Sequence, residues 1–218
     1  MYRYFKDPIS LVDVIKEVPS LDEGGTLEVL LACHALKRGY RARIYTYNMF
    51  IFDPTWIGLS NEEIILKLEE QLKYKKGAKL HRATNAYIEF LRLGGELRCQ
   101  DLTKNLLREY FDRNIPLLTG LSATYLYQSA REFGNEQGDS VYDDVRGFPM
   151  GHFVVLCGFG EDQKSIVVAD PYRENPFFND NYYEVKATHL INSIMLGMAT
   201  YDANLLAIQP AHQEPLEE

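Results

Sequence analysis

Cysteine is scarce in this sequence, and no long uninterrupted run of apolar residues occurs in it. Its three cysteines, Cys33, Cys99 and Cys157, are far apart along the chain. This spacing matches neither a disulfide framework nor a zinc motif, so we expect a cytoplasmic protein without a metal site. No segment reaches the roughly 18 apolar residues of a transmembrane helix, and the N-terminus lacks the pattern of a secretory signal. The sequence therefore predicts no membrane contact.

Positive charge is also in short supply. The chain has 23 Lys and Arg residues against 31 Asp and Glu, which gives a formal net charge of −8. Because phosphate groups bind to basic surfaces, we expect no nucleic-acid partner. We also expect no cofactor, since the glycine-rich stretch Gly158–Gly160 is not followed by a helix and reads as a hairpin turn rather than a phosphate-binding loop.

The chain contains a helical first half and a strand-like second half. Its 218 residues, 46% of them hydrophobic, predict one α+β domain over residues 1–218, mainly helical over 1–114 and mainly β over 115–210, with a frayed tail at 211–218. The stretch Gly24–Tyr40 is apolar nearly all round, which predicts a buried central helix between a helical layer and an antiparallel sheet. Further helices are expected over Asn61–Lys75, Lys79–Leu93, Leu102–Arg113 and Lys186–Leu196, and strands over Tyr40–Tyr47 and Asn204–Pro210.

A histidine and an aspartate mark the hairpin predicted from "GHFVVLCGFGEDQKSIVVADP", residues Gly151–Pro171. His152 begins the first strand and Asp170 ends the second, so the two side chains can be adjacent across an antiparallel pair. Asp170 would then accept a hydrogen bond from one ring nitrogen and leave the other free to act as a base. The alternative is a histidine held by a carboxylate for structural reasons alone. The acidic stretch Gly134–Gly147 is expected to form a mobile surface loop at the rim of this site.

The second half of the chain resembles the papain-like cysteine peptidase superfamily, most closely the double-glycine-leader (bacteriocin-processing) peptidases and their relatives. The stretches "IPLLTGL", "GHFVVLCGF" and "IVVADP", followed by a short helix and a closing strand, carry this resemblance between Ile115 and Pro210. It implies a papain-like fold in which His152 is the base and Asp170 its orienting carboxylate. It also implies a nucleophilic cysteine at the N-terminus of the central helix, preceded by a glutamine that stabilises the oxyanion.

A glutamate occupies the position that corresponds to the family's nucleophile. Aligning "EVPSLDEGGTLEVLL" on Asp22 and Gly24 places Glu23 there and Glu17 near the glutamine position. A carboxylate cannot form a thioester, and an ionised glutamate cannot donate to an oxyanion. Two interpretations of Glu23 stay open: it closes a capping box with Ser20 at the helix start, or it contacts a ligand or takes part in catalysis.

Other thiol and hydroxyl groups are poor substitutes for the missing nucleophile. Cys33 is predicted to be packed inside the central helix and inert, and Cys157 to point to the opposite face of its strand from His152. Thr26 lies near the helix start but would depend wholly on His152 for activation. The histidines without ligand-like spacing are His34, His81, His189 and His212.

These patterns predict a degenerate, peptidase-like protein that binds a peptide, amide or small acyl ligand in the former active-site cleft. One alternative is an active amide hydrolase or acyl transferase in which Glu23, His152 and Asp170 activate water. Another is a structural partner of a peptide-modifying enzyme, which would make a second protein its ligand.

Overall fold

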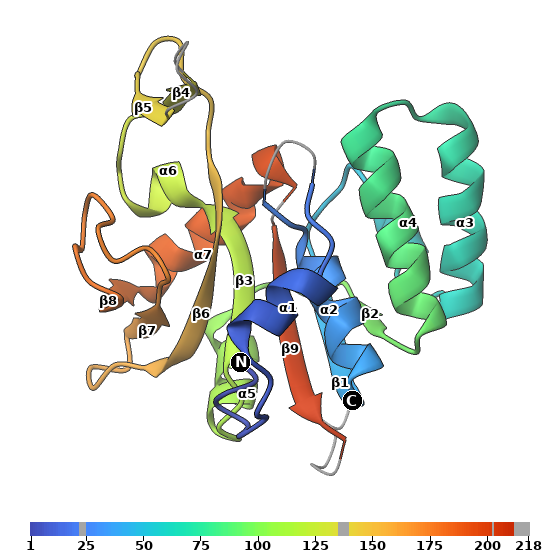
Figure 1. Ribbon diagram of the computed structural model, residues 1–218, viewed down its shortest axis with the longest axis horizontal. Coiled ribbons are helices and arrows are strands. Elements are labelled where there is room, and N and C mark those ends of the chain that lie inside the picture. Colours follow the sequence, from blue (N-terminus) through green and yellow to red (C-terminus); the bar gives the residue numbers. More distant parts are fainter. Residues whose placement is uncertain (22–24, 135–139, 202, 212–218) are drawn as a thin grey trace. The chain divides into compact units, whose positions relative to one another are not determined.

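The computed structural model of the protein describes residues 1–21, 25–134, 140–201 and 203–211 (Figure 1). Within these ranges the chain is α+β, as predicted, with seven α-helices, a mixed and mostly antiparallel sheet of seven strands, and a separate two-stranded pair. It divides into two compact units, which are described separately. The first unit comprises Met1–Gln100 and the chain from Leu206 onward, and the second comprises Asp101–Leu205.

The first unit contains most of the long helices. Its elements are α1 (Leu11–Glu17), α2 (Glu28–Lys37), β1 (Tyr40–Thr46), η1 (Pro54–Trp56), α3 (Asn61–Tyr74), α4 (Ala78–Arg92), β2 (Glu96–Arg98) and the greater part of β9 (Asn204–Pro210). The helix α2 packs against β1 and α4, and α3 packs against α4. The strands β1 and β2 run parallel, a pairing that was not predicted, since the antiparallel sheet was expected in the second half of the chain. The helices α3 and α4 form the long crossover that a parallel pair requires.

The central helix is buried as predicted, although it begins later than expected. Most of α2 is buried, including Val29, Leu30, Ala32, Cys33 and Ala35. Its first residue is Glu28 and its N-cap is Leu27, so Ser20 does not cap this helix. Glu23, the other residue of the capping box considered above, lies outside the described part of the chain. Gly25 explains the delay, because glycine is a poor helix former and Gly25 has a positive φ of 77°.

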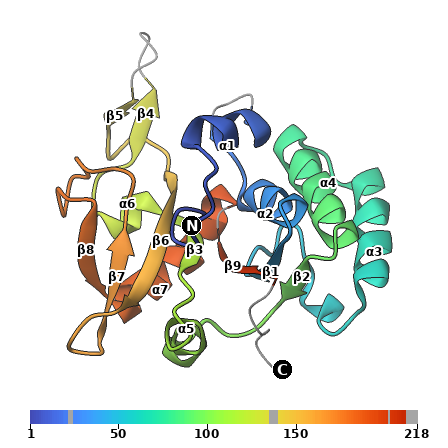
Figure 2. The same cartoon turned by 60° about the horizontal axis from the view of Figure 1, so that its bottom comes forward.

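The second unit carries the predicted hairpin within an antiparallel sheet. Its elements are α5 (Lys104–Phe111), β3 (Leu117–Ser122), α6 (Ala123–Leu126), β4 (Glu132–Gly134), β5 (Ser140–Tyr142), β6 (Gly151–Phe159), β7 (Ser165–Ala169), β8 (Tyr182–Lys186), α7 (Ala187–Leu196), η2 (Gly197–Thr200) and the first residues of β9. The strand order is β3-β6-β7-β8, and α7 packs against β3 (Figure 2). Two elements were not predicted. The helix α6 lies within a stretch whose composition is typical of a strand, and the strand β8 lies directly before α7, where no strand was expected.

The stretch Gly134–Gly147, predicted as a mobile surface loop, contains strand residues. β4 and β5 form the separate antiparallel pair, with Phe133 opposite Val141. Residues 135–139 lie outside the described part of the chain. We call residues 131–134 and 140–150 the arm, because Figures 1 and 2 both show β4 and β5 projecting from the second unit beyond the end of β6.

No helix within the described ranges is both long enough and apolar enough to cross a membrane.

Candidate functional site

The structure brings His152 and Asp170 together in the second unit. The ring Nε2 of His152 lies 2.8 Å from Oδ1 of Asp170. The antiparallel β6–β7 pairing starts at Val155 and Ala169, so both side chains lie just beyond the last paired residues of the hairpin. On its other side β6 continues its pairing with β3, where His152 is opposite Leu121, and this fixes the backbone of the histidine.

Asp170 accepts four hydrogen bonds. Besides His152, its Oδ1 accepts from the backbone N–H of Tyr172 at 2.8 Å. Its Oδ2 accepts from the hydroxyls of Tyr127 at 2.7 Å and Tyr183 at 2.6 Å. The Asp170 side chain is 0% exposed, whereas that of His152 is 22% exposed. A buried carboxylate is tolerated only when its oxygens are hydrogen-bonded, and here each oxygen has two donors.

These contacts keep Asp170 ionised. Burial by itself would raise the pKa of the carboxyl, but the hydrogen bonds from His152, Tyr127, Tyr183 and the amide of Tyr172 outweigh it and lower the pKa below 3.8. Conversely, burial and the hydrogen bond to Asp170 raise the pKa of both tyrosines well above the usual value. Both hydroxyls therefore stay protonated and act as donors.

The ionised carboxylate also fixes the tautomer of His152. Because an ionised carboxylate can only accept, Nε2 must carry the proton of the 2.8 Å bond. In the neutral ring Nδ1 then holds a lone pair, and among the described residues it has no hydrogen-bond partner. The arrangement leaves, on a partly exposed side chain, an imidazole nitrogen that can accept a hydrogen bond or a proton from a ligand.

The chain around Asp170 is held by further contacts. Asn181 bonds both backbone groups of Asp170: its carbonyl accepts from the Asp170 N–H at 2.8 Å, and its amide donates to the Asp170 carbonyl at 2.7 Å. The ring of Phe178 stacks on Tyr183 with centroids 3.7 Å apart. Asn175, which is buried, closes the intervening loop by donating to the carbonyl oxygens of Tyr172 and Asp180. The site is thus built in advance of any ligand.

Sequence reasoning identified His152 and Asp170 but missed Tyr127 and Tyr183. The signal was present in the tyrosine-rich stretches "ATYLY" and "YYEV". Nothing in their local pattern shows that one tyrosine follows a short helix and the other lies in a strand, or that both hydroxyls reach one carboxylate.

The other residues weighed around the start of the central helix belong to the first unit or lie outside the described residues. Glu23 lies outside the described part of the chain. Within the first unit, Glu17 is bonded to His34 at 3.0 Å, and the Thr26 hydroxyl donates to the carbonyl of Pro19 at 3.0 Å.

The two cysteines that were weighed as nucleophiles are poorly suited to that role. Burial raises the pKa of the Cys33 thiol to about 12, in agreement with the prediction that it is inert. Cys157 lies at a β-bulge in the second unit, because the register of the β6–β7 pair shifts between Leu156 and Gly158. Burial raises the pKa of its thiol as well.

Within the described ranges, no group of three or more His, Cys, Asp or Glu side chains is arranged to hold a metal ion. His34, His81 and His189 each have a hydrogen bond to another protein group, and His212 lies outside the described residues.

Comparisons with protein-family models, with curated proteins and with solved structures give no match to this chain. The chemistry of the site therefore rests on its own geometry.

Proposed function

We propose that the protein is a papain-like, peptidase-like binding protein that holds a peptide, amide or small acyl ligand at His152. The observation that carries this proposal is the saturated Asp170 carboxylate, which fixes Nε2 of His152 as a donor and leaves Nδ1 as an acceptor on a partly exposed side chain. An amide N–H of a ligand is a suitable partner for such an acceptor. The similarity of "GHFVVLCGF" and "IVVADP" to papain-like peptidases supports the same ligand class.

Binding is favoured over covalent catalysis because the described part of the second unit pairs no nucleophile with the histidine. An acyl-enzyme mechanism needs a thiol or hydroxyl within hydrogen-bonding reach of the base. Among the described residues, no serine, threonine or cysteine side chain bonds to His152. The fixed imidazole can therefore orient a ligand, and no attacking group accompanies it within the described residues.

Hydrolysis by activated water is the second candidate. Its support is the tautomer itself, because a neutral imidazole with a free Nδ1 lone pair is the form that removes a proton from water. The participation of Glu23 in such a reaction stays a prediction from the sequence alone.

Fluorescence anisotropy with a fluorescein-labelled hexapeptide amide ending in Gly-Gly tests the binding proposal. We expect saturable binding that weakens at least about tenfold in His152→Ala, since a ligand contact to a partly desolvated group is lost. His81→Ala is the matched control, because His81 is bonded to the Lys75 carbonyl in the first unit. Equal binding by wild type and His152→Ala, or no binding by wild type, would contradict the proposal.

Mass spectrometry of the same mixtures separates the two candidates. An unchanged peptide mass with saturable binding supports a binding protein. Cleavage fragments that disappear in His152→Ala would replace binding by hydrolysis as the function.

A further inference from the structure

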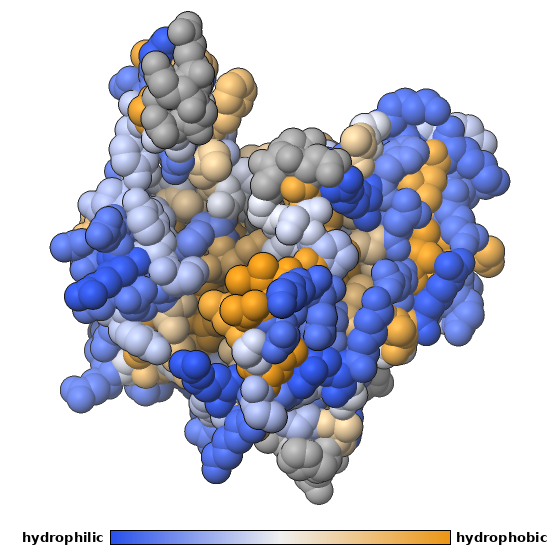
Figure 3. Space-filling view, viewed as in Figure 1, coloured by the Kyte–Doolittle hydropathy of each residue, from blue (hydrophilic) through white to orange (hydrophobic). Residues whose placement is uncertain are grey.

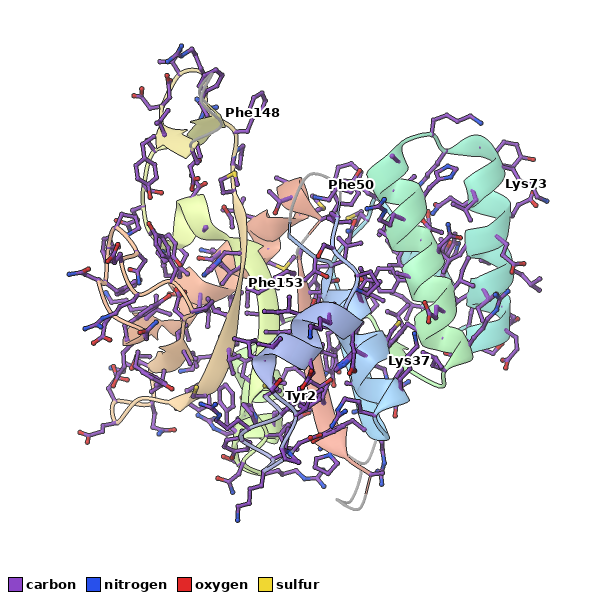
Figure 4. All side chains as sticks on the ribbon, viewed as in Figure 1. Tyr2, Lys37, Phe50, Lys73, Phe148 and Phe153 are labelled. Atoms are coloured by element: carbon purple, nitrogen blue, oxygen red, sulfur yellow. The ribbon has the colours of Figure 1, made fainter. Side chains whose placement is uncertain are left out.

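The strand β8 forms the edge of the sheet in the second unit. It stands last in the strand order, beside β7, and Figures 1 and 2 both show it as the outermost strand. The helix α7 contacts β3 and β7 as well as β8, so it lies across one face of the sheet and not along this edge. The arm, on which Figure 4 labels Phe148, projects away from β8. Within the described ranges, the outer edge of β8 is therefore open.

The pairing of β8 with β7 determines which of its backbone groups point outward. The two strands are antiparallel. Beside one end of the pair, the N–H of Asp170 donates to the carbonyl of Asn181 at 2.8 Å, and beside the other end the N–H of Ala187 donates to the carbonyl of Lys164 at 2.9 Å. In an antiparallel ladder, hydrogen-bonded pairs alternate with pairs that share no bond. Every second residue of β8 therefore directs its N–H and C=O away from β7, and these residues are Tyr182, Glu184 and Lys186.

Four of these outward groups have no hydrogen-bond partner among the described residues. They are the C=O of Tyr182, both backbone groups of Glu184 and the N–H of Lys186. The N–H of Tyr182 makes a long contact of 3.4 Å with Oδ1 of Asp180. Lys186 is the N-cap of α7, so its C=O accepts the first hydrogen bond of the helix. The edge thus offers two donors and two acceptors at the spacing of a strand, which is the spacing that an extended backbone matches.

The side chains leave this edge accessible and polar. Tyr182 is 67% exposed, and Glu184 and Lys186 are exposed as well. Figure 3 shows hydrophilic surface on the side of the second unit where β8 lies. An edge of this kind has little apolar surface to bury, so a partner binds it through backbone hydrogen bonds and cross-strand side-chain pairs.

A second copy of the chain is a poor partner for this edge. Antiparallel self-pairing that uses all the outward groups centres on Glu184 and places its side chain opposite the same side chain of the other copy, and like charges directly opposite are unfavourable. The strand has only five residues, and short edge strands with charged side chains resist self-association. A peptide can instead place Lys or Arg opposite Glu184, which gives a favourable cross-strand pair.

We propose that the open edge of β8 is a binding site for an extended peptide segment, which joins the sheet as a further antiparallel strand with Lys or Arg opposite Glu184. Antiparallel addition continues the pairing of β6, β7 and β8, and it is the more stable kind of pairing per residue. The site is separate from His152, because β7 lies between β8 and the strand β6 that carries the histidine. It goes beyond the proposed function and does not depend on it.

Fluorescence anisotropy with the fluorescein-labelled peptide amide Gly-Thr-Val-Lys-Thr-Val-Gly tests the proposal. When its Lys lies opposite Glu184, the backbone N–H and C=O of this Lys bond to β8, whereas those of the next Thr point away. Methylation of the Lys backbone nitrogen removes a bond and separates the strands, so it should weaken binding to wild type at least about tenfold. Methylation of the Thr nitrogen should change binding less than about threefold. Replacing the Lys by Glu should weaken binding about two- to fivefold, and Glu184→Gln should remove this difference.

Lys186→Pro tests the edge from the side of the protein. Lys186 has a φ of −56°, which a proline ring adopts, and its N–H is not bonded to β7, so the variant should fold. The ring removes one outward donor and should weaken binding of the unmethylated peptide at least about tenfold. Lys186→Gln is the matched control, because it removes the charge but keeps the N–H, and it should bind as wild type does. If Lys186→Pro does not fold, the methylated peptides decide with wild type alone.

Hydrogen exchange locates the bound peptide directly. Saturation of wild type with the unmethylated peptide should slow exchange at the amides of Glu184 and Lys186, which point outward. Unchanged exchange at both amides under saturation would overturn the proposal.

The remaining outcomes separate the edge of β8 from the His152 site. Equal binding of the two methylated peptides, unchanged binding by folded Lys186→Pro, or no binding by wild type overturns the proposal. Binding that is lost in His152→Ala but kept in Lys186→Pro overturns it as well and places the peptide at His152. Binding that is lost in Lys186→Pro but kept in His152→Ala supports it. Light scattering that shows self-association of wild type, lost in Lys186→Pro, would assign the edge to a second copy of the chain and overturn the proposal.

Discussion

Asp170 is the residue to which the other members of the site are hydrogen-bonded. Its buried carboxylate is compatible with folding only because His152, Tyr127, Tyr183 and the amide of Tyr172 donate to it. Removing the carboxylate would leave these donors without an acceptor in a dry environment, which costs more than losing a solvated contact. The sequence order of the hairpin was enough to predict that His152 and Asp170 meet. It was not enough to predict the two tyrosines, because their positions depend on long-range packing.

Replacement of Asp170 should therefore be strongly destabilising. We expect Asp170→Ala to lower the free energy of unfolding by about 3–5 kcal/mol, as for other buried charged partners. Asp170→Asn should cost less, about 1–3 kcal/mol, because the amide oxygen still accepts from two donors. Urea unfolding measures both, with the exposed Asp144→Asn as a control that should change stability by less than about 0.5 kcal/mol. Equal effects of Asp170→Ala and Asp144→Asn would contradict the network.

The lowered pKa of Asp170 predicts how stability depends on acid. A carboxyl whose folded pKa is below its unfolded value of 3.8 contributes stability above that value, and this contribution is lost as the pH falls through the folded pKa. Tyr127→Phe or Tyr183→Phe removes one donor, so the folded pKa should move back toward 3.8. The decline of stability between roughly pH 5 and pH 2 should then be shallower than in wild type.

Unfolding in urea at a series of pH values checks this expectation. Tyr182→Phe is the control, since this exposed neighbour of Tyr183 should keep the acid profile of wild type. A profile that is identical in Tyr127→Phe and wild type would mean that the hydroxyl does not stabilise the carboxylate.

At the scale of the element, regular periodicity determined which segments could be predicted. The helices α3 and α4 lie within a residue of their expected bounds, because both have a clear apolar face of helical period. The short helix α6 was missed because "ATYLY" is rich in aromatic residues and contains too few turns to show a period. The strand β8 was missed because it mixes exposed and buried residues and follows directly on a polar loop, so its local sequence does not stand out as a strand.

The turn of the arm depends on Gly147. A Cβ at this position would lie 2.4 Å from the Asp143 carbonyl oxygen and 2.6 Å from the carbonyl carbon of Arg131. Both are backbone atoms, so Gly147→Ala should displace the turn at a cost of about 1–3 kcal/mol. It should also increase hydrogen exchange at the amides of Val145 and Arg146.

Gly134→Ala is the matched control within the same arm, because nothing lies within 4 Å of its added Cβ. We expect it to exchange and unfold as wild type does. Equal behaviour of the two variants would argue against the close approach at Gly147.

The central helix offers a second test at this scale. Leu30 is 9% exposed in α2, whereas Leu31 is only partly buried. Leu30→Ala should lower the free energy of unfolding by about 2–5 kcal/mol, and Leu31→Ala by less. Thermal and urea unfolding measure both. A loss below about 0.5 kcal/mol for Leu30→Ala would contradict its place in the core.

For the whole molecule, composition and the order of elements established the α+β class but not the division into units. The boundary of the second unit falls between Gln100 and Asp101 and again between Leu205 and Leu206, where neither a linker nor a change of composition marks the sequence. Contacts, rather than local patterns, define these boundaries. The same is true of the parallel β1–β2 pair, which local alternation of apolar residues cannot distinguish from an antiparallel one.

Truncation of the chain after Leu205 should affect the two units differently. It removes Leu206, Ala207 and Ile208, which are all buried and belong to the first unit. We expect amides of α2 and β1 to lose protection from hydrogen exchange, since each large apolar residue contributes roughly 1.5–3 kcal/mol by burial. Amides of β6 and α7 should keep theirs. Equal loss in both units, or none in either, would contradict the division.

The path of the chain through the two units also has a consequence for biosynthesis. The second unit is one continuous stretch, Asp101–Leu205, whereas the first unit needs the residues from Leu206 onward in addition to Met1–Gln100. The ribosome synthesises residues 1–100 first. The part of β9 that completes the first unit, from Leu206 onward, emerges only after the whole second unit has been synthesised. The usual N-to-C order of co-translational folding is therefore reversed: the unit made second can fold first, and the nascent first unit must remain incomplete in the meantime.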